Sequence, residues 1–381
     1  MTTAALSNYA ATLEGLQRKE RRRFLMPQRG IDFTSNDFLA LANSQRLKKA
    51  IEDALARGVS VGSGGSRLLR GNTPEHEALE EEAAEFFGAQ RVLFFGSGFA
   101  ANSALFSMLP QRGDLILYDS LIHASAHEGI AAGKADTVQI PHNDVGYLEW
   151  QIREWRKTGG RGTPWIAVES LYSMEGDRAP LNELAELADS YDGILVVDEA
   201  HATGVFGHNG KGFASKLEGR ENVIALHTCG KALGVSGALL ALPTTLADYL
   251  VNRALSFIYS TSPSPLVAAA VREALHVLED EPERRRALSE LVVMMGERLK
   301  SQFGIEPSGS QIQPVVLGSN ARALRVADAL QANGYDVRAI RPPTVPDGTA
   351  RLRLSITLNV DAQQVSAMLD CLAVALEDHP S

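Results

Sequence analysis

The chain has 381 residues with 45% hydrophobic and 22% charged residues, and this composition excludes a disordered or fibrous protein. Its net charge of -9 argues against nucleic acid or an anionic membrane as a general partner. Its two cysteines are too few for a disulfide scaffold, and no Cys/His spacing is typical of a metal site.

The first 25 residues predict an amphipathic helix that ends in a basic cluster, Lys19 and Arg21 to Arg23. This segment has no apolar run of the signal-peptide kind, and no later segment reaches the roughly 18 apolar residues of a membrane span. We therefore expect a cytoplasmic protein without a membrane partner.

Residues 73–87 predict a helix, because a capping Thr and a Pro precede acidic residues and then apolar residues at helical spacing. Short apolar runs follow and alternate with longer periodic segments. The runs are RVLFF at 91, DLILYD at 114, TVQI at 137, WIAVE at 165, ILVVDE at 194, VIALH at 223 and ALLAL at 238. This pattern predicts an α/β fold with a mostly parallel sheet covered on both faces.

The last hundred residues show a different order of elements: a helix, the strand IQPVVLG, a second helix, and the strands DVRAI and RLRLSI. We predict a smaller α+β domain at residues 283–381. Residues 44–282 would form the large domain, and residues 1–43 an arm that packs with the small one.

Three motifs have competing interpretations. GSGFAA at 96–101 follows a strand and opens a helix, and Asp119 ends the next strand, which together suit a nucleotide-dependent dehydrogenase. DEAH at 198–201 resembles a helicase box, but no GxxxxGK[ST] loop accompanies it, so we reject that interpretation. GSGGSR at 62–67 is either a flexible loop or a ligand contact.

Polar residues gather where strands of the predicted sheet end. Asp198 ends one strand, His201 follows it, and Lys231 follows the next strand in an apolar, glycine-rich turn. GSGFAA would add a helix N-terminus suited to a phosphate. Each feature alone is compatible with capping, burial or a surface turn. Together they match the ring nitrogen, aldehyde and phosphate of pyridoxal 5'-phosphate (PLP).

These motifs also carry a family resemblance over nearly the whole chain. It runs through SNDFLALA at 35, FGSGFAAN at 95, SLIHASAHEG at 120, SMEGDRAPL at 173, VVDEAHATGVFG at 196, TCGKALGVSGA at 228, IYSTSPSP at 258 and IRPPTVPDGTARLRLSIT at 340. The chain resembles the α-oxoamine synthases, which are fold-type I PLP enzymes with a large aminotransferase-like domain. The last motif points to the members of biotin biosynthesis.

The resemblance implies a role for each matching residue. Lys231 would bind PLP covalently and move the substrate Cα proton, Asp198 would keep the ring nitrogen protonated, and His123 would stack on the ring and contact substrate. Further cofactor contacts are implied for Ser173 and His201 and, at the phosphate, for Gly98, Phe99 and Thr228. The second chain of a homodimer would add Ser260 and Thr261, which places the site at a subunit interface.

Substrate contacts are implied as well. Arg353 would grip the amino-acid carboxylate, a task that suits its bidentate fork, and Arg351 should share its strand face. Arg21, Asn36 and Thr344 match positions near the acyl substrate. Glu175 departs from the family pattern, which has Asp there.

The resemblance implies condensation of L-alanine with a pimeloyl thioester, either pimeloyl-CoA or a pimeloyl-carrier protein, with loss of carbon dioxide. Related acyltransferases such as 2-amino-3-ketobutyrate CoA ligase keep the same cofactor residues and remain an alternative. A dehydrogenase would leave Lys231, Asp198 and Arg353 unexplained. A catalytically silent binding protein of this fold would be expected to lack Lys231.

Overall fold

The structure is a computed structural model that describes residues 4–380. The chain forms two compact units. The large unit comprises residues 36–173 and 177–287, and the small unit comprises residues 4–35, 174–176 and 288–380. No helix among the described residues is long and apolar enough to cross a membrane.

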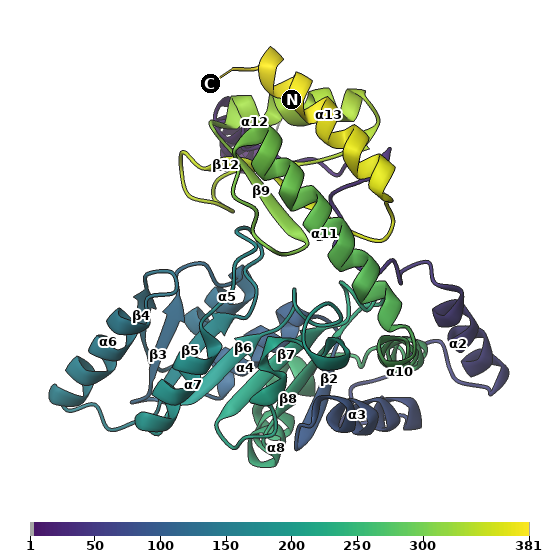
Figure 1. The fold of residues 1–381 in the computed structure, drawn as a ribbon. Helices are drawn as coiled ribbons and strands as arrows, with labels where there is room; N and C mark the ends of the chain where they lie inside the picture. The colour runs from purple at the N-terminus through teal and green to yellow at the C-terminus, as the bar shows by residue number, and fades with distance from the viewer. Residues whose placement is uncertain (1–3, 381) are drawn as a thin grey trace. The chain divides into compact units, whose positions relative to one another are not determined.

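A seven-stranded sheet forms the centre of the large unit (Figure 1). Its strand order is β2-β8-β7-β6-β5-β3-β4. The strands are β2 (Arg91–Phe95), β3 (Leu115–Asp119), β4 (Asp136–Ile140), β5 (Pro164–Glu169), β6 (Ile194–Asp198), β7 (Val223–Thr228) and β8 (Ala238–Leu242). All seven apolar runs in the sequence are strands, and β3 to β7 pair in parallel, so the predicted α/β fold with a mostly parallel sheet is confirmed.

β8 is the exception, because it runs antiparallel to both of its neighbours, β7 and β2. Only nine residues separate the end of β7 from the start of β8. A parallel connection needs a crossover of about a dozen residues or more, so this short loop forces the chain to reverse.

Alternate residues of the strands point to opposite faces of the sheet, and each face has its own core. In β6, Val196 packs into the core on the side of α4, α5, α8 and α9, whereas Leu195 and Val197 pack on the side of α6 and α7. Burial on both faces explains why these strands are continuous apolar runs.

Helices and short 3-10 helices connect the strands and pack around the sheet. They are α2 (Gln45–Ala56), α3 (Pro74–Phe87), α4 (Gly98–Met108), α5 (Ala124–Ala132), α6 (Val145–Lys157), α7 (Leu181–Ser190), η2 (His208–Gly210), η3 (Phe213–Lys216), α8 (Thr244–Arg253), α9 (Leu255–Ile258) and α10 (Pro265–Asp280). The predicted helix over 73–87 is α3; Thr73 and His76 form its capping box, and Gly88 ends it in the left-handed region.

The small unit is built on an antiparallel three-stranded sheet in the order β11-β12-β9. Helix α12 packs against this sheet, and α13 packs against α12 (Figure 1). The elements are η1 (Ala4–Leu6), α1 (Ser7–Arg18), β1 (Ile31–Asp32), β9 (Ile312–Gly318), α12 (Asn320–Ala332), β10 (Tyr335–Asp336), β11 (Ala339–Ile340), β12 (Ala350–Ser355) and α13 (Ala362–Asp378). Helix α11 (Pro282–Phe303) contains the boundary between the units, after residue 287.

Residues 36–43 belong to the large unit, whereas the sequence led us to group them with the N-terminal arm. Phe38, Leu39 and Leu41 are fully buried, and the Asp37 carboxylate accepts hydrogen bonds from the backbone N–H groups of Leu41 (2.8 Å) and Ala42 (3.2 Å). Burial of three large apolar side chains holds this segment in place. The functional division into 1–43, 44–282 and 283–381 stays a prediction.

Candidate active site

Four neighbouring strands of the large unit end in polar residues. Asp119, Glu169, Asp198 and Thr228 are the last residues of β3, β5, β6 and β7. Parallel strands end at one edge of a sheet, which is where ligands bind in α/β folds. Glu169 is the register partner of Asp198, so these two carboxyl groups are neighbours.

Lys231 lies in the loop between β7 and β8. Its Nζ is 2.8 Å from Nε2 of His201, which follows β6. The loop is closed by hydrogen bonds from the N–H of Val235 to the Cys229 carbonyl and from the N–H of Gly234 to the Lys231 carbonyl (both 2.9 Å). The lysine and histidine that the sequence singled out separately are thus in contact.

Gly234 explains why this turn is rich in glycine. Its φ of +67° lies in the left-handed region, and a Cβ there would sit 2.4 Å from backbone atoms of Leu41 and Ala42. Only glycine fits such a close approach. The SNDFLALA segment therefore packs directly behind the turn that carries Lys231.

A chain of hydrogen bonds joins Asp198 to His123. Asn102, on α4, donates from its amide nitrogen to Asp198 Oδ2 (2.9 Å) and to Ser125 Oγ (3.0 Å). Ser125 Oγ lies 2.8 Å from His123 Nδ1, and the N–H of Ser125 also donates to that nitrogen (3.2 Å). Asp198 Oδ1 accepts from the N–H of Ala200 (2.9 Å). We call Asp198, Asn102, Ser125 and His123 the site network.

His123 is held as a neutral imidazole. Burial lowers its pKa, and the Lys231 charge lowers it further, while Asp198 opposes the shift. Since Nδ1 accepts from the N–H of Ser125, the neutral ring carries its proton on Nε2. A neutral, oriented ring is suited to stacking on a flat ligand.

Glu169 brings a second carboxyl group to this edge, with 3% of its surface exposed. Burial and the neighbouring Asp198 raise its pKa well above the ordinary value, whereas Lys231 and the Ser173 N–H, which donates to Oε2 (3.2 Å), lower it. Among the described residues no hydrogen bond reaches Glu169 Oε1. Burial next to Asp198 therefore favours the protonated form of Glu169.

The start of α4 faces Thr228. Ser97 caps this helix by accepting from the N–H of Ala100 (3.1 Å), and a Cβ on Gly98 would lie 3.6 Å from Thr228 Oγ1. The first N–H groups of a helix and a nearby hydroxyl form an anion site. Gly98 and Thr228 therefore lie close together, and the assignment of Gly98, Phe99 and Thr228 to a phosphate stays a prediction.

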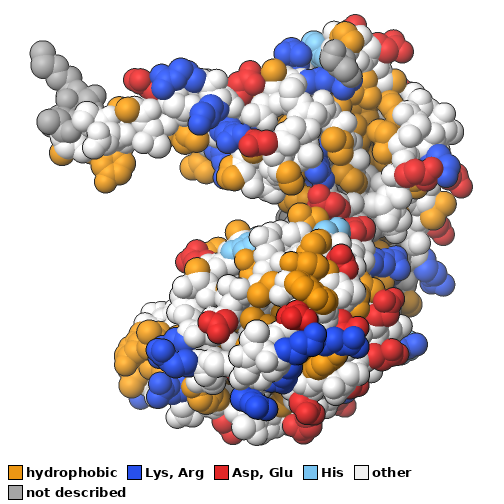
Figure 2. All heavy atoms as spheres, turned by 90° about the vertical axis from the view of Figure 1, so that its left-hand side faces the viewer, with side chains coloured by type: hydrophobic (Ala, Val, Ile, Leu, Met, Phe, Trp, Pro, Cys, Tyr) orange, Lys and Arg blue, Asp and Glu red, His pale blue; other side chains and the backbone are white. Residues whose placement is uncertain are grey.

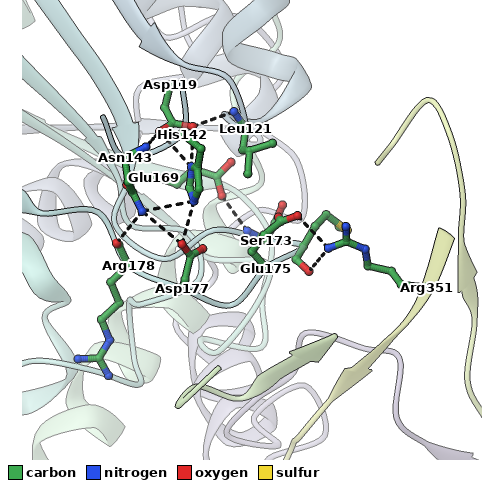
Figure 3. Close-up of polar contacts among 11 residues, drawn as sticks. Asp119, Leu121, His142, Asn143, Glu169, Ser173, Glu175, Asp177, Arg178 and Arg351 are labelled. Atoms are coloured by element: carbon green, nitrogen blue, oxygen red, sulfur yellow. Dashed lines mark hydrogen bonds and ion pairs between the residues drawn. The ribbon is translucent and has the colours of Figure 1, made fainter. Parts of the chain in front are cut away.

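A second network joins Asp119, at the end of β3, to His142 and Asp177 (Figure 3). His142 contacts Asp119 Oδ1 through Nδ1 (2.9 Å) and Asp177 Oδ2 through Nε2 (2.8 Å). Burial disfavours the charged imidazole, but both carboxylates favour it and raise the pKa of His142 to about 10. We call Asp119, His142 and Asp177 the support network.

The support network weakens the dehydrogenase interpretation. Asp119 also accepts from the N–H groups of Leu121 and Asn143 (both 2.8 Å) and is 4% exposed. Its carboxylate is thus engaged by protein groups, whereas a dehydrogenase would need it to hold a ribose hydroxyl.

Two further motifs have structural roles. Glu199, the second residue of DEAH, is fully buried; it accepts from Ser170 Oγ (2.7 Å) and from the N–H of Ala214, and burial raises its pKa to about 7. The GSGGSR loop anchors residues 260–264. Ser63 Oγ donates to the Pro263 carbonyl (2.6 Å) and the N–H of Ser262 donates to the Gly65 carbonyl (2.9 Å).

The structure does not bring every predicted site residue into the site network. Ser260 and Thr261 are exposed, and among the described residues they make no hydrogen bond to the network. Asn36 belongs to the large unit and is half-buried. Arg21, Thr344 and Arg353 belong to the small unit. These assignments stay predictions.

In the small unit, Arg351 and Arg353 are both buried in β12, with 5% and 7% exposed. Arg353 donates to Ser355 Oγ (2.7 Å). Arg351 donates to Glu175 Oε1 (2.8 Å) and to the Met174 carbonyl (3.2 Å), as Figure 3 shows. The departure at Glu175 thus keeps a carboxylate that pairs with Arg351.

Arg21 and Thr344 lie in the arm and the β11–β12 connection of the small unit. Arg21 forms an ion pair with Asp347, and Thr344 Oγ1 accepts from Arg23 (2.9 Å). Among residues 4–380 no group of three or more His, Cys, Asp or Glu side chains is arranged to hold a metal ion.

The sequence analysis did not assign Asn102, Ser125 or Glu169. Glu169 could have been found, since it ends an apolar strand as Asp198 does. Asn102 and Ser125 gave a weaker signal, a polar residue among buried positions of a helix, and only the fold shows that they join Asp198 to His123.

Residues 28–372 match the family model "Aminotransferase class I and II". The chain belongs to this family. The 8-amino-7-oxononanoate synthase of Chromobacterium violaceum is 42% identical, covering 90% of this chain and 88% of its own. The chain is therefore an acyltransferase-type member of the family, and the predicted α-oxoamine synthase resemblance is confirmed.

Solved structures agree on the fold. An 8-amino-7-oxononanoate synthase from Francisella tularensis has a TM-score of 0.77 at 30% identity, covering 92% of this chain and 98% of that one. A structure of serine palmitoyltransferase with PLP as its internal aldimine has a TM-score of 0.89 at 24% identity and covers 99% of both chains. These similarities confirm the fold-type I architecture.

Proposed function

We propose that this chain is a PLP-dependent enzyme that condenses L-alanine with a pimeloyl thioester, with loss of carbon dioxide, to give 8-amino-7-oxononanoate. The contact between Lys231 Nζ and His201 Nε2, on the sheet edge that Asp198 and the start of α4 share, carries this proposal. The names of the synthase relatives support the substrates, and the PLP-bound serine palmitoyltransferase supports the cofactor.

The groups at this edge fit PLP by their chemistry. Lys231 supplies an amine for the aldehyde, Asp198 a carboxylate for the ring nitrogen, and the start of α4 with Thr228 an anion site for the phosphate. Asp198 accepts hydrogen bonds from Asn102 and the N–H of Ala200, which leaves lone pairs for a further donor.

When bound, PLP withdraws electrons from the bonds to the amino-acid Cα, which makes the Cα proton acidic. Lys231 accepts that proton and returns it, which its amine can do when unprotonated. Asp198 holds a proton on the ring nitrogen, and the amide of Asn102 fixes the orientation of the carboxylate. His123 offers a neutral face and an Nε2–H to the substrate side.

Arg353 is proposed to bind the alanine carboxylate, because its guanidinium is a fixed planar fork. Its hydrogen bond to Ser355 Oγ fixes the side chain along β12. Arg21, Asn36 and Thr344 are proposed to lie near the acyl substrate, and Ser173 and His201 to contact the cofactor.

We propose a cytoplasmic homodimer in which the second chain supplies Ser260 and Thr261. Segments around these residues expose large apolar side chains: Leu69 is 84% exposed, Tyr259 81% and Val61 70%. The hydrogen bond from Ser264 Oγ to the Val61 carbonyl (2.5 Å) brings two of these segments together. Contiguous exposed apolar surface is typical of an interaction site.

The test of the cofactor is spectroscopic and chemical. Protein incubated with PLP should gain visible absorbance, and borohydride should fix the cofactor on a peptide that contains Lys231. Lys231→Ala should show neither, whereas Lys216→Ala, at an exposed lysine of the same unit, should behave as wild type. Failure to bind PLP would overturn the proposed mechanism.

The test of the substrates is product formation. Pure protein with L-alanine and pimeloyl-CoA should release 8-amino-7-oxononanoate and free thiol. Higher kcat/KM for glycine with acetyl-CoA would instead identify the related ligase activity. Size-exclusion chromatography with light scattering, together with complementation of Lys231→Ala by Ser260→Ala/Thr261→Ala in mixed dimers, would check whether the second chain contributes to the site.

A further inference from the structure

A cluster of buried polar side chains lies near the ends of β6 and β7 in the large unit, and the proposed mechanism uses none of them. Glu199 and His227 are fully buried, Thr203 is 1% exposed, and the side chain of Glu218 is 1% exposed. Figure 2 shows where charged side chains usually lie, with Lys, Arg, Asp and Glu (blue and red) spread over the surface. Burial of such groups costs free energy unless each is paired. These four residues, which we call the buried cluster, are paired with one another.

Thr203 is the centre of the buried cluster. Its hydroxyl donates to the Glu199 carbonyl (2.8 Å) and lies 2.8 Å from His227 Nδ1. A hydroxyl has one proton, so with that proton on the Glu199 carbonyl the oxygen accepts from the Nδ1–H of His227. Glu218 Oε2 lies 3.1 Å from the other ring nitrogen, Nε2. His227 is thus held at both nitrogens, and Thr203 ties it to the backbone that follows β6.

The His227 ring is also fixed by packing. It stacks on Phe87 of α3, with the ring centroids 3.7 Å apart and an angle of 17° between the rings. Alternate residues of a strand point to opposite faces, so Thr228, the next residue of β7, points to the other face. There a Cβ on Gly98, at the start of α4, would lie 3.6 Å from the Thr228 hydroxyl oxygen. The end of β7 is therefore held on one face by the buried cluster and presents Thr228 on the other.

The buried cluster also holds both ends of the turn that carries His201. The N–H groups of Ala202 (3.0 Å) and Thr203 (2.8 Å) donate to the Glu199 carbonyl, which closes the turn. Glu199 begins this turn and Thr203 ends it, and both belong to the buried cluster. His201 lies between them, and its Nε2 is 2.8 Å from Lys231 Nζ. The position of His201 therefore depends on how firmly the two ends of the turn are held.

We propose that Thr203 and His227 are positioning residues that together set the place of His201 relative to Thr228. The inference rests on the proposed function, in which His201 contacts the cofactor and Thr228 its phosphate. Because PLP is a rigid ring, the groups that bind it must be held at fixed separations. Buried ion pairs contribute little net stability, so stability alone is a weak reason for the buried cluster. Neither residue touches cofactor or substrate in this proposal, since both act through their neighbours.

The test measures PLP affinity and a spectroscopic signature in variants that keep the shape of the side chain. Thr203→Val loses the hydroxyl but keeps the volume, and it should raise the Kd for PLP about tenfold, the effect of one or two hydrogen bonds. It should also shift the pH at which the visible absorbance of the PLP-bound protein changes, because His201 moves relative to Lys231. Thr203→Ser keeps the hydroxyl and should return both values close to those of wild type.

A double-mutant cycle tests whether the two residues act as one link. His227→Gln keeps a donor for Glu218 near the position of Nε2 but has none at Nδ1, so it should also raise the Kd for PLP about tenfold. Thr203→Val combined with His227→Gln should raise the Kd no further than either single change, since the link is already broken. Independent effects, about a hundredfold in the double variant, would overturn the joint role.

A loss of stability must be separated from a loss of position. Ser310→Ala is the matched control, because it removes a fully buried hydroxyl of the small unit that donates to the Ile312 carbonyl (3.3 Å). It should lower the free energy of unfolding in a denaturant titration, as Thr203→Val does, but leave the Kd for PLP and the absorbance titration unchanged. If Thr203→Val lowered stability and left both PLP measurements at wild-type values, the buried cluster would only stabilise the fold, and the inference would be wrong.

Measurements without PLP separate this inference from the proposed function. In the protein free of cofactor, NMR titration of the His201 ring reports its contact with Lys231, and Thr203→Val should shift this titration whereas Ser310→Ala should not. If wild type binds no PLP but this difference is seen, the proposed function fails while the link from the buried cluster to His201 stands. If PLP binds and product forms but Thr203→Val matches wild type in every measurement, only the positioning role fails.

Discussion

Two histidines of the large unit lie near carboxylates at the same sheet edge, yet the structure gives them opposite charge states. His142 contacts Asp119 and Asp177 directly, at 2.9 and 2.8 Å, and its pKa is raised to about 10. His123 reaches Asp198 only through Ser125 and Asn102, and burial lowers its pKa.

The two histidines differ in whether the imidazole contacts a carboxylate directly, and this contact decides the direction of the pKa shift. A direct contact stabilises the imidazolium through charge and a hydrogen bond. His123 makes no such direct contact with Asp198, so burial outweighs the opposing charge of Asp198 and lowers the pKa of His123. The support network thus fixes a loop with a charged group, whereas the site network presents a neutral one.

The largest effect on activity is expected when a second carboxylate is introduced into the site network, since the support network also has two carboxylates. Asn102→Asp would place a second carboxylate at the 2.9 Å contact with Asp198. Two carboxylates so close share one proton, so Asp198 would no longer hold a full charge. We expect kcat/KM to fall about a hundredfold and the pKa of His123 to rise. Steady-state kinetics and NMR titration of the histidines measure both.

Asn102→Ala is the control for this variant, because it removes the amide without adding charge. It should lower kcat/KM less and leave the direction of the His123 pKa shift unchanged. If both variants lost activity equally and the pKa of His123 did not rise in Asn102→Asp, the electrostatic account of the site network would be wrong.

The next effect is on stability and concerns the support network. His142→Gln removes the positive charge between Asp119, which is 4% exposed, and Asp177. Breaking a partly buried ion pair leaves a carboxylate without its partner, so the free energy of unfolding should fall by about 2 kcal/mol. His276→Gln, at a half-exposed histidine with longer contacts, should change it by less than about 0.5 kcal/mol in the same denaturant titration. Equal effects would contradict the assignment.

The pH dependence of stability provides a third measurement. The pKa of His142 is raised to about 10 in the folded protein, against about 6.5 for an unfolded histidine. Its contribution is therefore fully present below about pH 6.5 and is lost as the pH rises through 10. The free energy of unfolding should fall over this range by at most about 1.4 kcal/mol per pH unit. A His142→Gln titration that falls as steeply as wild type would exclude His142 as the cause.

The sequence predicted the strands, and it singled out candidate site residues, for a physical reason. Strands that are buried on both faces are apolar throughout, so they can be recognised as continuous apolar runs. A polar residue that ends such a run, as Asp198 does, or that follows one closely, as Lys231 does, is therefore easy to recognise. The reversal at β8 could also have been expected from its nine-residue loop, but the strand order depends on packing that no local pattern records.

Partners that are distant in sequence could not be predicted. Asp119 looked like a ribose ligand because it ends a strand, but His142, 23 residues later, contacts it in the fold. Asn102 sits in an apolar helix and meets Asp198 across 96 residues. The close packing of Leu41 and Ala42 likewise depends on the turn at Gly234, nearly 200 residues away.

The smallest expected effect separates orientation from charge in the site network. Ser125→Ala removes the hydroxyl between Asn102 and His123, but the N–H of residue 125 still donates to His123 Nδ1 at 3.2 Å. The ring should therefore keep its tautomer, and kcat/KM should fall only about fivefold, the effect of one lost hydrogen bond. Ser103→Ala, next to Asn102 on α4, is the matched control and should leave kcat/KM unchanged. A shifted pH profile of kcat/KM in Ser125→Ala would show instead that the Ser125 hydroxyl transmits the effect of the Asp198 charge to His123. Of the two groups between Asp198 and His123, only Asn102 could then account for the different pKa shifts of His123 and His142.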